Sequence, residues 1–202
     1  GTGTGQYFTA LQNTTVDPVG DDVNWREVVG VTAVFGLSGL IFNSVKDLKL
    51  GVTSGGLSVD LSLIGEGLRV RWLGYYGPLD GGGNAGVVKK GAHTDDGGFV
   101  LSIDGDTYIQ ADISGYVDPL QYGASLIDKT KNAPAIQAIL NKTGKVISHN
   151  KFEIASEVNI PSGSRFNFLD SGGIYASDGY LTSDTGKSLL VLEPAAEDIL
   201  FE

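Results

Sequence analysis

The chain has 202 residues, 30 of them glycine, with 24 acidic and 14 basic side chains and a formal net charge of −10. It contains no cysteine, which excludes disulfides, thiolate catalysis and cysteine-based zinc sites. Its scattered basic residues argue against a nucleic acid partner, because phosphate binding needs clustered lysine and arginine. No apolar run reaches the roughly 20 residues that span a bilayer, so no membrane partner is expected.

The first thirty residues contain short apolar pieces separated by turn residues. Residues 5–15, Asp17-Pro18 and residues 24–28 follow in an order that resembles the closing half of small carbohydrate-binding-type β modules. Such modules recur in tailspike and baseplate proteins. We therefore predict that residues 1–30 are the end of a small β attachment module. The opening half of the module and an initiator methionine are both missing, so a longer parent chain is expected upstream.

The stretch of residues 28–42 is the most apolar of the chain and is interrupted by three glycines. We predict that residues 31–44 are a linker that holds a buried strand or a contact between chains. Its apolar character does not make it a signal peptide, because no basic segment precedes it.

A second small β module is expected at residues 45–117. Residues 44–48 precede a strand pattern at 68–73, which leads into Gly74-Tyr75-Tyr76 and then Asp80-Gly81-Gly82-Gly83. Residues 95–100 and 108–111 complete the pattern. This order resembles a module that lies ahead of the β-helix in phage tailspikes. The sequence leaves open whether the module is an independent domain or a collar against the β-helix.

Residues 118–202 are predicted to be the capping helix and first coils of a parallel β-helix. Asn132 is the expected N-cap of an amphipathic helix that has Pro134 in its first turn, where a missing N–H costs nothing. Ile136, Ile139 and Leu140 then share one helical face. Short apolar strands separated by turns follow, and strands this short need stacked coils to bury their faces. The predicted strands are residues 145–147, 152–154, 158–160 and 166–169.

This last region resembles the pectate-lyase-like right-handed parallel β-helix proteins, and specifically bacteriophage tailspikes. Tyr122-Gly123-Ala124, Asp128 and the stretch 135–138, Ala-Ile-Gln-Ala, fit the family pattern. Lys131 and Asn132 stand where the family often has two aspartates. The resemblance therefore carries no metal or charge role over to these two positions.

Four pairs of carboxylates are candidates for glycoside hydrolysis, which needs two carboxyl groups about 5 to 9.5 Å apart. They are Asp95 with Asp96, Asp104 with Asp106, Asp178 with Asp184, and Glu197 with Asp198. The resemblance places catalytic carboxylates on later coils or between subunits. We therefore expect no catalytic, cofactor-binding or metal-binding residue in this chain, and no cofactor.

Other polar motifs have simpler interpretations. Residues 80–84 and 104–106 are predicted to be turns, and His93 and His149 are interpreted as surface histidines because neither has a second histidine at ligand spacing. Four aromatic residues could stack on sugars, although Trp72 is expected in the core because it lies in an apolar strand pattern. They are Trp25, Trp72, Tyr75 and Tyr76.

The favoured hypothesis is a mainly β, N-terminal virion-attachment and neck fragment of a homotrimeric phage tailspike. Its downstream β-helix would bind and depolymerise a host surface polysaccharide, and the expected location is the virion tail, outside the cell. The other partners implied by the resemblance are the phage tail or baseplate, or another tailspike. Two alternatives remain open: a polysaccharide lyase or glycoside hydrolase active by itself, and a carbohydrate-binding module that depends on Trp25.

Overall fold

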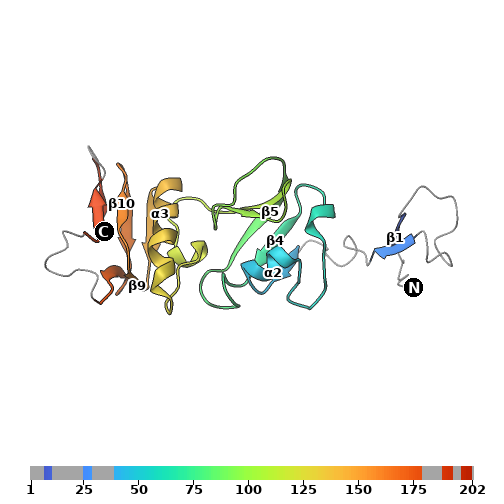
Figure 1. Ribbon diagram of the computed structural model, residues 1–202, viewed down its shortest axis with the longest axis horizontal. Helices are drawn as coiled ribbons and strands as arrows, with labels where there is room; N and C mark the ends of the chain where they lie inside the picture. Colours follow the sequence, from blue (N-terminus) through green and yellow to red (C-terminus); the bar gives the residue numbers. More distant parts are fainter. Residues whose placement is uncertain (1–6, 11–24, 29–38, 179–187, 193–196, 202) are drawn as a thin grey trace. The chain divides into compact units, whose positions relative to one another are not determined.

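The computed structural model describes residues 7–10, 25–28, 39–178, 188–192 and 197–201 (Figure 1). The chain divides into two units, residues 1–39 and residues 40–202. In the first unit, strand β1 (Tyr7–Ala10) pairs antiparallel with β2 (Trp25–Val28). The second unit contains a sheet module and a capped parallel β-helix.

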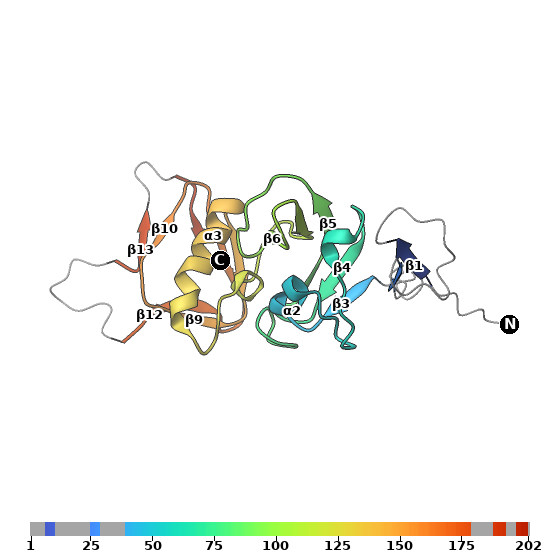
Figure 2. The same cartoon turned by 45° about the vertical axis from the view of Figure 1, so that its right-hand side comes forward.

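The sheet module is built on five strands in the order β3-β4-β5-β7-β6. The pair β3 and β4 is parallel, and the other neighbours are antiparallel. Figure 2 shows helix α2 (Val45–Leu50) beside β3. The strands are β3 (Leu40–Phe42), β4 (Arg69–Trp72), β5 (Asn84–Lys90), β6 (Val100–Ser102) and β7 (Thr107–Ala111).

The sheet module begins inside the stretch that was expected to hold a buried strand. Leu40 and Phe42 are fully buried and pair in register with Val70 and Trp72 of β4. Ser44 caps helix α2 by accepting a hydrogen bond from the N–H of Asp47. Residues 40–44 therefore belong to the sheet module, because their burial and pairing are part of its core.

Alternate residues along the strands point to opposite faces of the sheet. Val70, Trp72, Val88 and Ile109 are all buried on the inner face, while the residues between them are partly or fully exposed. Trp72 is thus a core residue, as its place in an apolar strand pattern predicts. The residues between them form an outer face.

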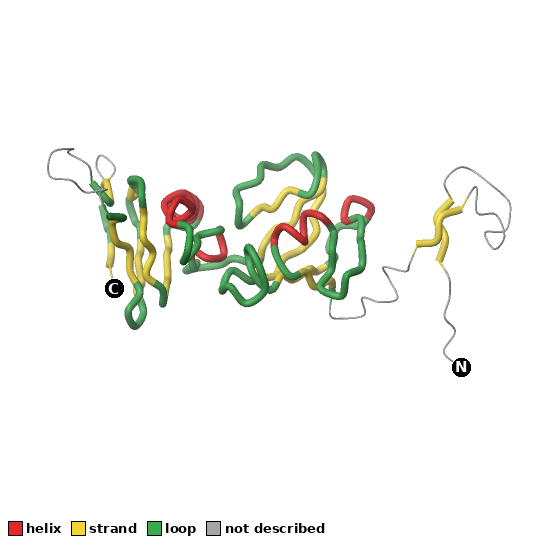
Figure 3. Tube along the Cα trace, turned by 60° about the horizontal axis from the view of Figure 1, so that its bottom comes forward, coloured by secondary structure: helices red, strands yellow, loops and turns green. Residues whose placement is uncertain are grey.

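The β-helix has three parallel sheets, β8-β11-β14, β9-β12 and β10-β13. Figure 3 shows the strands side by side with the long helix at one end of the stack. Each of the four predicted strands overlaps an observed one. The strands are β8 (Lys145–Ser148), β9 (Lys151–Ile154), β10 (Val158–Ile160), β11 (Arg165–Phe168), β12 (Gly173–Ala176), β13 (Leu190–Leu192) and β14 (Leu200–Phe201).

The long helix α3 (Asn132–Lys142) covers the first coil. Its apolar face is buried as predicted: Ile136 and Ile139 are 0% exposed and Leu140 is 3% exposed, in one core with the strands of the coil. Burial of each such side chain contributes roughly 1.5–3 kcal/mol. The helix therefore closes one end of the β-helix with apolar contacts.

At this end of the β-helix, hydrogen bonds from outside the coil pair backbone groups of the strands. Val117 pairs with β8, donating to the carbonyl of Lys145 and accepting from the N–H of Ile147. Gln137 of α3 accepts from the N–H of Asn159 in β10 at 2.7 Å and donates to its carbonyl at 3.1 Å. Unpaired strand edges invite pairing with other chains, so these contacts protect the coil.

Asn132 has a different role from the predicted N-cap. The helix begins at Asn132 itself, and the preceding Lys131 makes no side-chain capping bond. The Asn132 side chain is buried, accepts from the N–H of Ser125 at 2.7 Å and donates to the carbonyl of Glu153 in β9 at 2.8 Å. The amide thus ties the loop before the helix to the edge of the first coil.

Candidate functional site

The loop between β4 and β5 is organised by one carboxylate. Asp80 accepts hydrogen bonds from four backbone N–H groups, at 2.9 Å from Tyr75, 2.7 Å from Tyr76, 3.1 Å from Gly77 and 2.8 Å from Gly82. Partial burial raises the pKa of Asp80, but the four donors outweigh burial and leave the pKa below its ordinary value. The carboxylate thus builds the loop that ends at the predicted turn, whose last residue, Asn84, belongs to β5.

This loop presents two tyrosines whose hydroxyls bind backbone carbonyls elsewhere. Tyr75 donates to the carbonyl of Gly97 at 2.8 Å, and Tyr76 donates to that of Gly123 at 2.5 Å. The two rings meet edge to face with centroids 5.0 Å apart. Burial, followed by the nearby Tyr76 and the carboxylates of Asp95 and Asp96, raises the pKa of Tyr75 to about 12. The hydroxyls of both tyrosines are therefore engaged in holding the structure together.

The hydrogen bond of Tyr76 connects the sheet module to the segment that leads into α3. Glycines on both sides of this connection allow aromatic rings to pack directly on the backbone. A Cβ built at Gly98 would lie 2.4 Å from the ring of Tyr122, and one at Gly123 would lie 2.6 Å from the ring of Tyr75. Gly123 also has a φ of 79°, which favours glycine. We call these contacts, together with those of Lys142, the joint.

Lys142, in the last turn of α3, completes the joint. Its Nζ lies 4.2 Å from the centroid of the Phe99 ring and 3.9 Å from a carboxylate oxygen of Asp96. A cation over an aromatic face gains roughly 0.5–1 kcal/mol at exposed sites. The sheet module therefore contacts α3 and the segment that leads into it, through Tyr76, Gly98 and Phe99.

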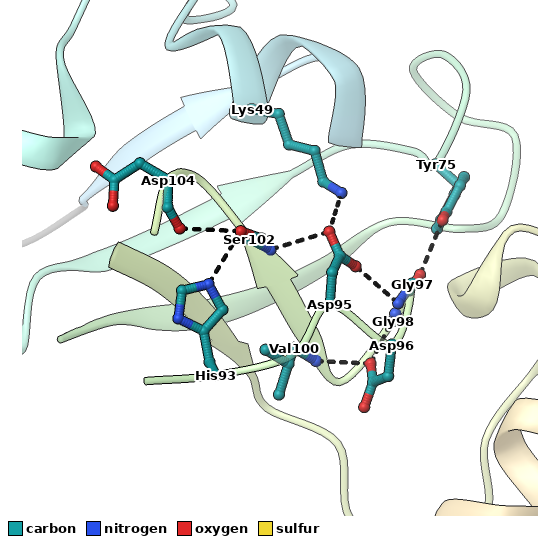
Figure 4. Close-up of polar contacts among 10 residues, drawn as sticks. All are labelled: Lys49, Tyr75, His93, Asp95, Asp96, Gly97, Gly98, Val100, Ser102 and Asp104. Carbon is teal, nitrogen blue, oxygen red and sulfur yellow. Dashed lines mark hydrogen bonds and ion pairs between the residues drawn. The ribbon is translucent and has the colours of Figure 1, made fainter. Parts of the chain in front are cut away.

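The loop of residues 93–99 supplies a second part of the module's side of the joint, through Asp96, Gly98 and Phe99. Figure 4 shows the polar contacts that shape this loop. Asp95 binds the ammonium of Lys49 on α2 and accepts from the N–H groups of Gly97 and Ser102. Asp96 accepts from the N–H groups of Gly98 and Val100. Partial burial raises the pKa of Asp95, but Lys49 and the backbone donors leave it below the ordinary value.

The carboxylates that were candidates for glycoside hydrolysis are mostly engaged in local contacts. Asp95 and Asp96 are both engaged as acceptors in this loop, and Asp104 accepts from the N–H groups of Asp106 and Thr107 in the predicted hairpin turn. Asp184 lies outside the described residues. Glu197 and Asp198 are exposed, and their backbone carbonyls accept hydrogen bonds from the coil.

His93 and Ser102 are close enough to resemble a base and a nucleophile. His93 Nε2 lies 2.9 Å from Ser102 Oγ, and its Nδ1 lies 2.9 Å from the carbonyl oxygen of Gly91. However, Ser102 Oγ also lies 3.1 Å from the carbonyl oxygen of Asp104, and the Ser102 N–H donates to Asp95. The hydroxyl of Ser102 thus holds the β6–β7 turn, and its N–H holds the preceding loop. His93 is partly buried rather than fully on the surface.

The other histidine lies on the β-helix. His149 is exposed and its Nδ1 lies 2.8 Å from a carboxylate oxygen of Asp170. Asp118 caps the short helix Pro119–Tyr122 through the N–H of Leu120. Burial raises the pKa of Asp118, although the Leu120 N–H, Ser148 and His149 oppose the rise. Within the described ranges, no group of three or more His, Cys, Asp or Glu residues could hold a metal ion.

The aromatic residues that could stack on sugars differ in how exposed they are. Trp72 is 2% exposed in the core, so it cannot contact a ligand at the surface. Tyr76 is 52% exposed, although its hydroxyl is bound in the joint. The side chain of Trp25 lies outside what the structure describes. No helix in the described ranges combines the length and apolar character needed to cross a bilayer.

Comparison with solved structures supports the fold. The tailspike gp49 of Acinetobacter baumannii bacteriophage Fri1, a capsular polysaccharide depolymerase, matches 80% of this chain with a TM-score of 0.57 and 11% identity. The enzymatically active domain of bacteriophage CBA120 tailspike protein 4 matches 84% with a TM-score of 0.55 and 16% identity. The tailspike of Acinetobacter phage vB_ApiP_P1 matches 80% with a TM-score of 0.52 and 17% identity.

These likenesses show that the chain has the tailspike-type parallel β-helix fold, and they confirm the fold implied by the sequence motifs. No protein-family profile and no curated protein sequence matches the chain. The chain spans 23%, 32% and 28% of the lengths of the CBA120, Fri1 and vB_ApiP_P1 proteins respectively.

Proposed function

We propose that this chain is the neck of a phage tailspike. In this proposal residues 1–30 belong to an attachment module on the virion side, and residues 40–202 connect that module to the coils of a β-helix. The observation that carries the proposal is the joint, in which Tyr76 bonds to Gly123 and Gly98 lies against Tyr122. A spike that meets a cell surface needs its base held rigidly to its shaft, and close contacts of this kind hold two parts in one orientation.

Binding and depolymerisation of a host surface polysaccharide belong, in this proposal, to further coils of a longer parent. The Fri1 tailspike is described as a capsular polysaccharide depolymerase, and this chain spans 32% of its length. Asp95, Asp96 and Asp104 are engaged in backbone contacts, which favours a structural role for the neck itself. The location is then the virion tail, and the tail, baseplate or another tailspike is the partner at the attachment end.

The test is to incubate the purified chain with a panel of bacterial capsular polysaccharides and lipopolysaccharides. Released oligosaccharides are measured by mass spectrometry, and lyase products by the ultraviolet absorbance of their unsaturated ends. The proposal predicts no release. Release by this chain alone would contradict it and favour the lyase or glycoside hydrolase alternative.

The same panel tests the carbohydrate-binding alternative. Glycan binding that is lost in Trp25→Ala would favour a binding module at the N-terminus. Attachment is tested separately by asking whether the chain binds purified tail particles that lack their spikes. The proposal predicts saturable binding to such particles, and absence of binding would contradict the attachment role.

A further inference from the structure

Three polar contacts in series connect the segment after β5 to the turn after β6. The Nδ1 atom of His93 lies 2.9 Å from the carbonyl oxygen of Gly91, and its Nε2 atom lies 2.9 Å from Ser102 Oγ. Ser102 Oγ in turn donates to the carbonyl oxygen of Asp104 at 3.1 Å. Figure 4 shows the two contacts of the Ser102 hydroxyl. We call these three contacts the clasp.

The number of hydrogen bonds in the clasp depends on the charge of the imidazole. The carbonyl oxygens at the two ends can only accept, and the serine hydroxyl has one proton to donate. A neutral imidazole has one N–H. If that proton is on Nδ1, then Nε2 needs the serine proton, and Ser102 can no longer donate to Asp104. If it is on Nε2, the lone pair of Nδ1 faces the carbonyl oxygen of Gly91. Only the imidazolium, with both ring nitrogens as donors, completes all three hydrogen bonds.

We propose that the clasp is a proton-binding site that stabilises the loop of residues 93–99 at mildly acidic pH. With the proton bound, His93 donates to both of its partners and Ser102 donates to Asp104. Without the proton, one of the three contacts joins two acceptors and is lost. The unfolded chain has none of these contacts, so the folded chain binds the proton in preference. Stability of the loop therefore falls as the pH rises and the proton is released.

Histidine is the side chain whose charge ordinarily changes between pH 5 and 8. The nearby carboxylates keep their charge in this range. Partial burial raises the pKa of Asp95, but Lys49 and the backbone donors leave it below its ordinary value, and backbone N–H groups of the turn lower the pKa of Asp104. The ring of Tyr108 on β7 packs on the imidazole with centroids 4.7 Å apart. Further charged groups on the elements around the clasp are Asp96 in the loop, Asp106 in the turn, Lys89 with its partner Glu66, and Lys90.

The clasp lies at the two ends of a loop that contributes to the joint. Asp96, Gly98 and Phe99 of this loop contact α3 and the segment that leads into it. His93 begins the loop, and Ser102 follows it at the end of β6. The clasp thus ties the ends of the loop together. Loss of one of its hydrogen bonds lets these ends separate more often, so the pH acts on this part of the joint.

The test is hydrogen exchange at the amides of Gly97 and Gly98, which donate to Asp95 and Asp96 within the loop. Protection factors, which remove the intrinsic pH dependence of exchange, are compared at pH 8 and pH 5.5 in the full chain, within the range where histidine titrates. We expect them to be about two- to tenfold higher at the lower pH, the effect of one hydrogen bond. Equal protection at the two pH values would overturn the proposal.

The chain has two histidines, so each can be replaced while the other remains. His93→Gln removes the titrating group of the clasp, and its loop protection is expected to be independent of pH. His149→Gln is the matched control, because His149 is exposed on the β-helix, where it pairs with Asp170. This control is expected to keep the pH dependence of the wild type. A pH dependence that persists in His93→Gln would assign the effect to another group and overturn the proposal.

A direct measurement on His149→Gln covers the case in which His93→Gln fails to fold. Nitrogen-15 NMR of the one remaining imidazole reports which ring nitrogens carry protons. At pH 5.5 we expect a proton on both nitrogens, each slow to exchange with water because it is hydrogen-bonded, and at pH 8 a single N–H. Ring protons that exchange rapidly at the lower pH would show that the clasp does not form. The proton effect concerns this loop alone, so neither result bears on the glycan or tail-particle assays of the proposed function.

Discussion

The hydroxyl of Tyr76 in the sheet module donates a 2.5 Å hydrogen bond to the carbonyl oxygen of Gly123, just before the β-helix cap. The two residues are 47 positions apart in the chain, and each belongs to a part with its own core. The bond therefore reports directly on whether the two parts are held together.

Replacing Tyr76 by Phe removes this bond and leaves the ring in place. We expect a loss of roughly 0.5–1.5 kcal/mol in the free energy of unfolding, the usual net worth of one hydrogen bond. Chemical denaturation followed by tryptophan fluorescence, to which both Trp25 and Trp72 contribute, measures the loss. Tyr116→Phe is the matched control, because Tyr116 is 37% exposed and lies outside the joint. Equal stabilities of the two variants would contradict a role for the Tyr76 bond.

Gly98→Ala tests the close packing in the joint. The added Cβ would lie 2.4 Å from the Tyr122 ring, so the joint must open, at a cost of about 1–3 kcal/mol. At Gly105 an added Cβ meets no atom within 4 Å, and Gly105→Ala should be neutral or slightly stabilising. Thermal unfolding of the two variants gives the comparison. A tolerated Gly98→Ala would show that the two parts do not need to touch here.

Asn132→Ala removes the amide that ties α3 to the first coil. The N–H of Ser125 and the carbonyl of Glu153 would both lose a partner, and each buried polar group left unpaired costs about 1–3 kcal/mol. Asn141→Ala, on the exposed side of the same helix, controls for the helix propensity of alanine. We expect Asn132→Ala to be much less stable to urea than Asn141→Ala.

Asp118→Asn should raise stability at neutral pH. Burial raises the pKa of Asp118 in the folded protein above the unfolded value of about 3.9. At a pH above the folded-state pKa, the buried charge lowers the free energy of unfolding. This loss disappears as the pH falls through the folded-state pKa towards the unfolded-state pKa. Asparagine keeps an oxygen for the Leu120 N–H and removes the charge. The melting temperature of the variant should exceed that of the wild type at pH 7 and approach it near pH 4. A lower melting temperature at pH 7 would contradict the assignment.

Much of the fold follows from local patterns in the sequence. The alternation around Trp72 predicts its burial, and the spacing of Ile136, Ile139 and Leu140 predicts the buried face of α3. The β-helix strands are recognisable because short apolar pieces alternate with turns. Each of these signals involves side chains that are close in sequence, where periodicity alone identifies the buried face.

The joint could not be predicted in the same way. The partners of Tyr76 and Asn132 depend on how distant segments pack, and nothing local distinguishes an amide that caps a helix from one that binds a neighbouring strand. Asp80 is an intermediate case. Its four N–H partners lie within five residues, so an aspartate among glycines signals the turn, but the sequence does not show that the turn presents Tyr75 and Tyr76 to the joint.

The central claim is that the sheet module and the β-helix cap are joined as one rigid neck. Native-state hydrogen exchange tests it most directly, by comparing the opening free energies of amides in β5 and β7 with those in α3 and β8. We predict one shared value for both groups, lowered equally by Gly98→Ala and unchanged by Gly105→Ala. Two different values, with Gly98→Ala affecting only one group, would show two independent domains and contradict the account.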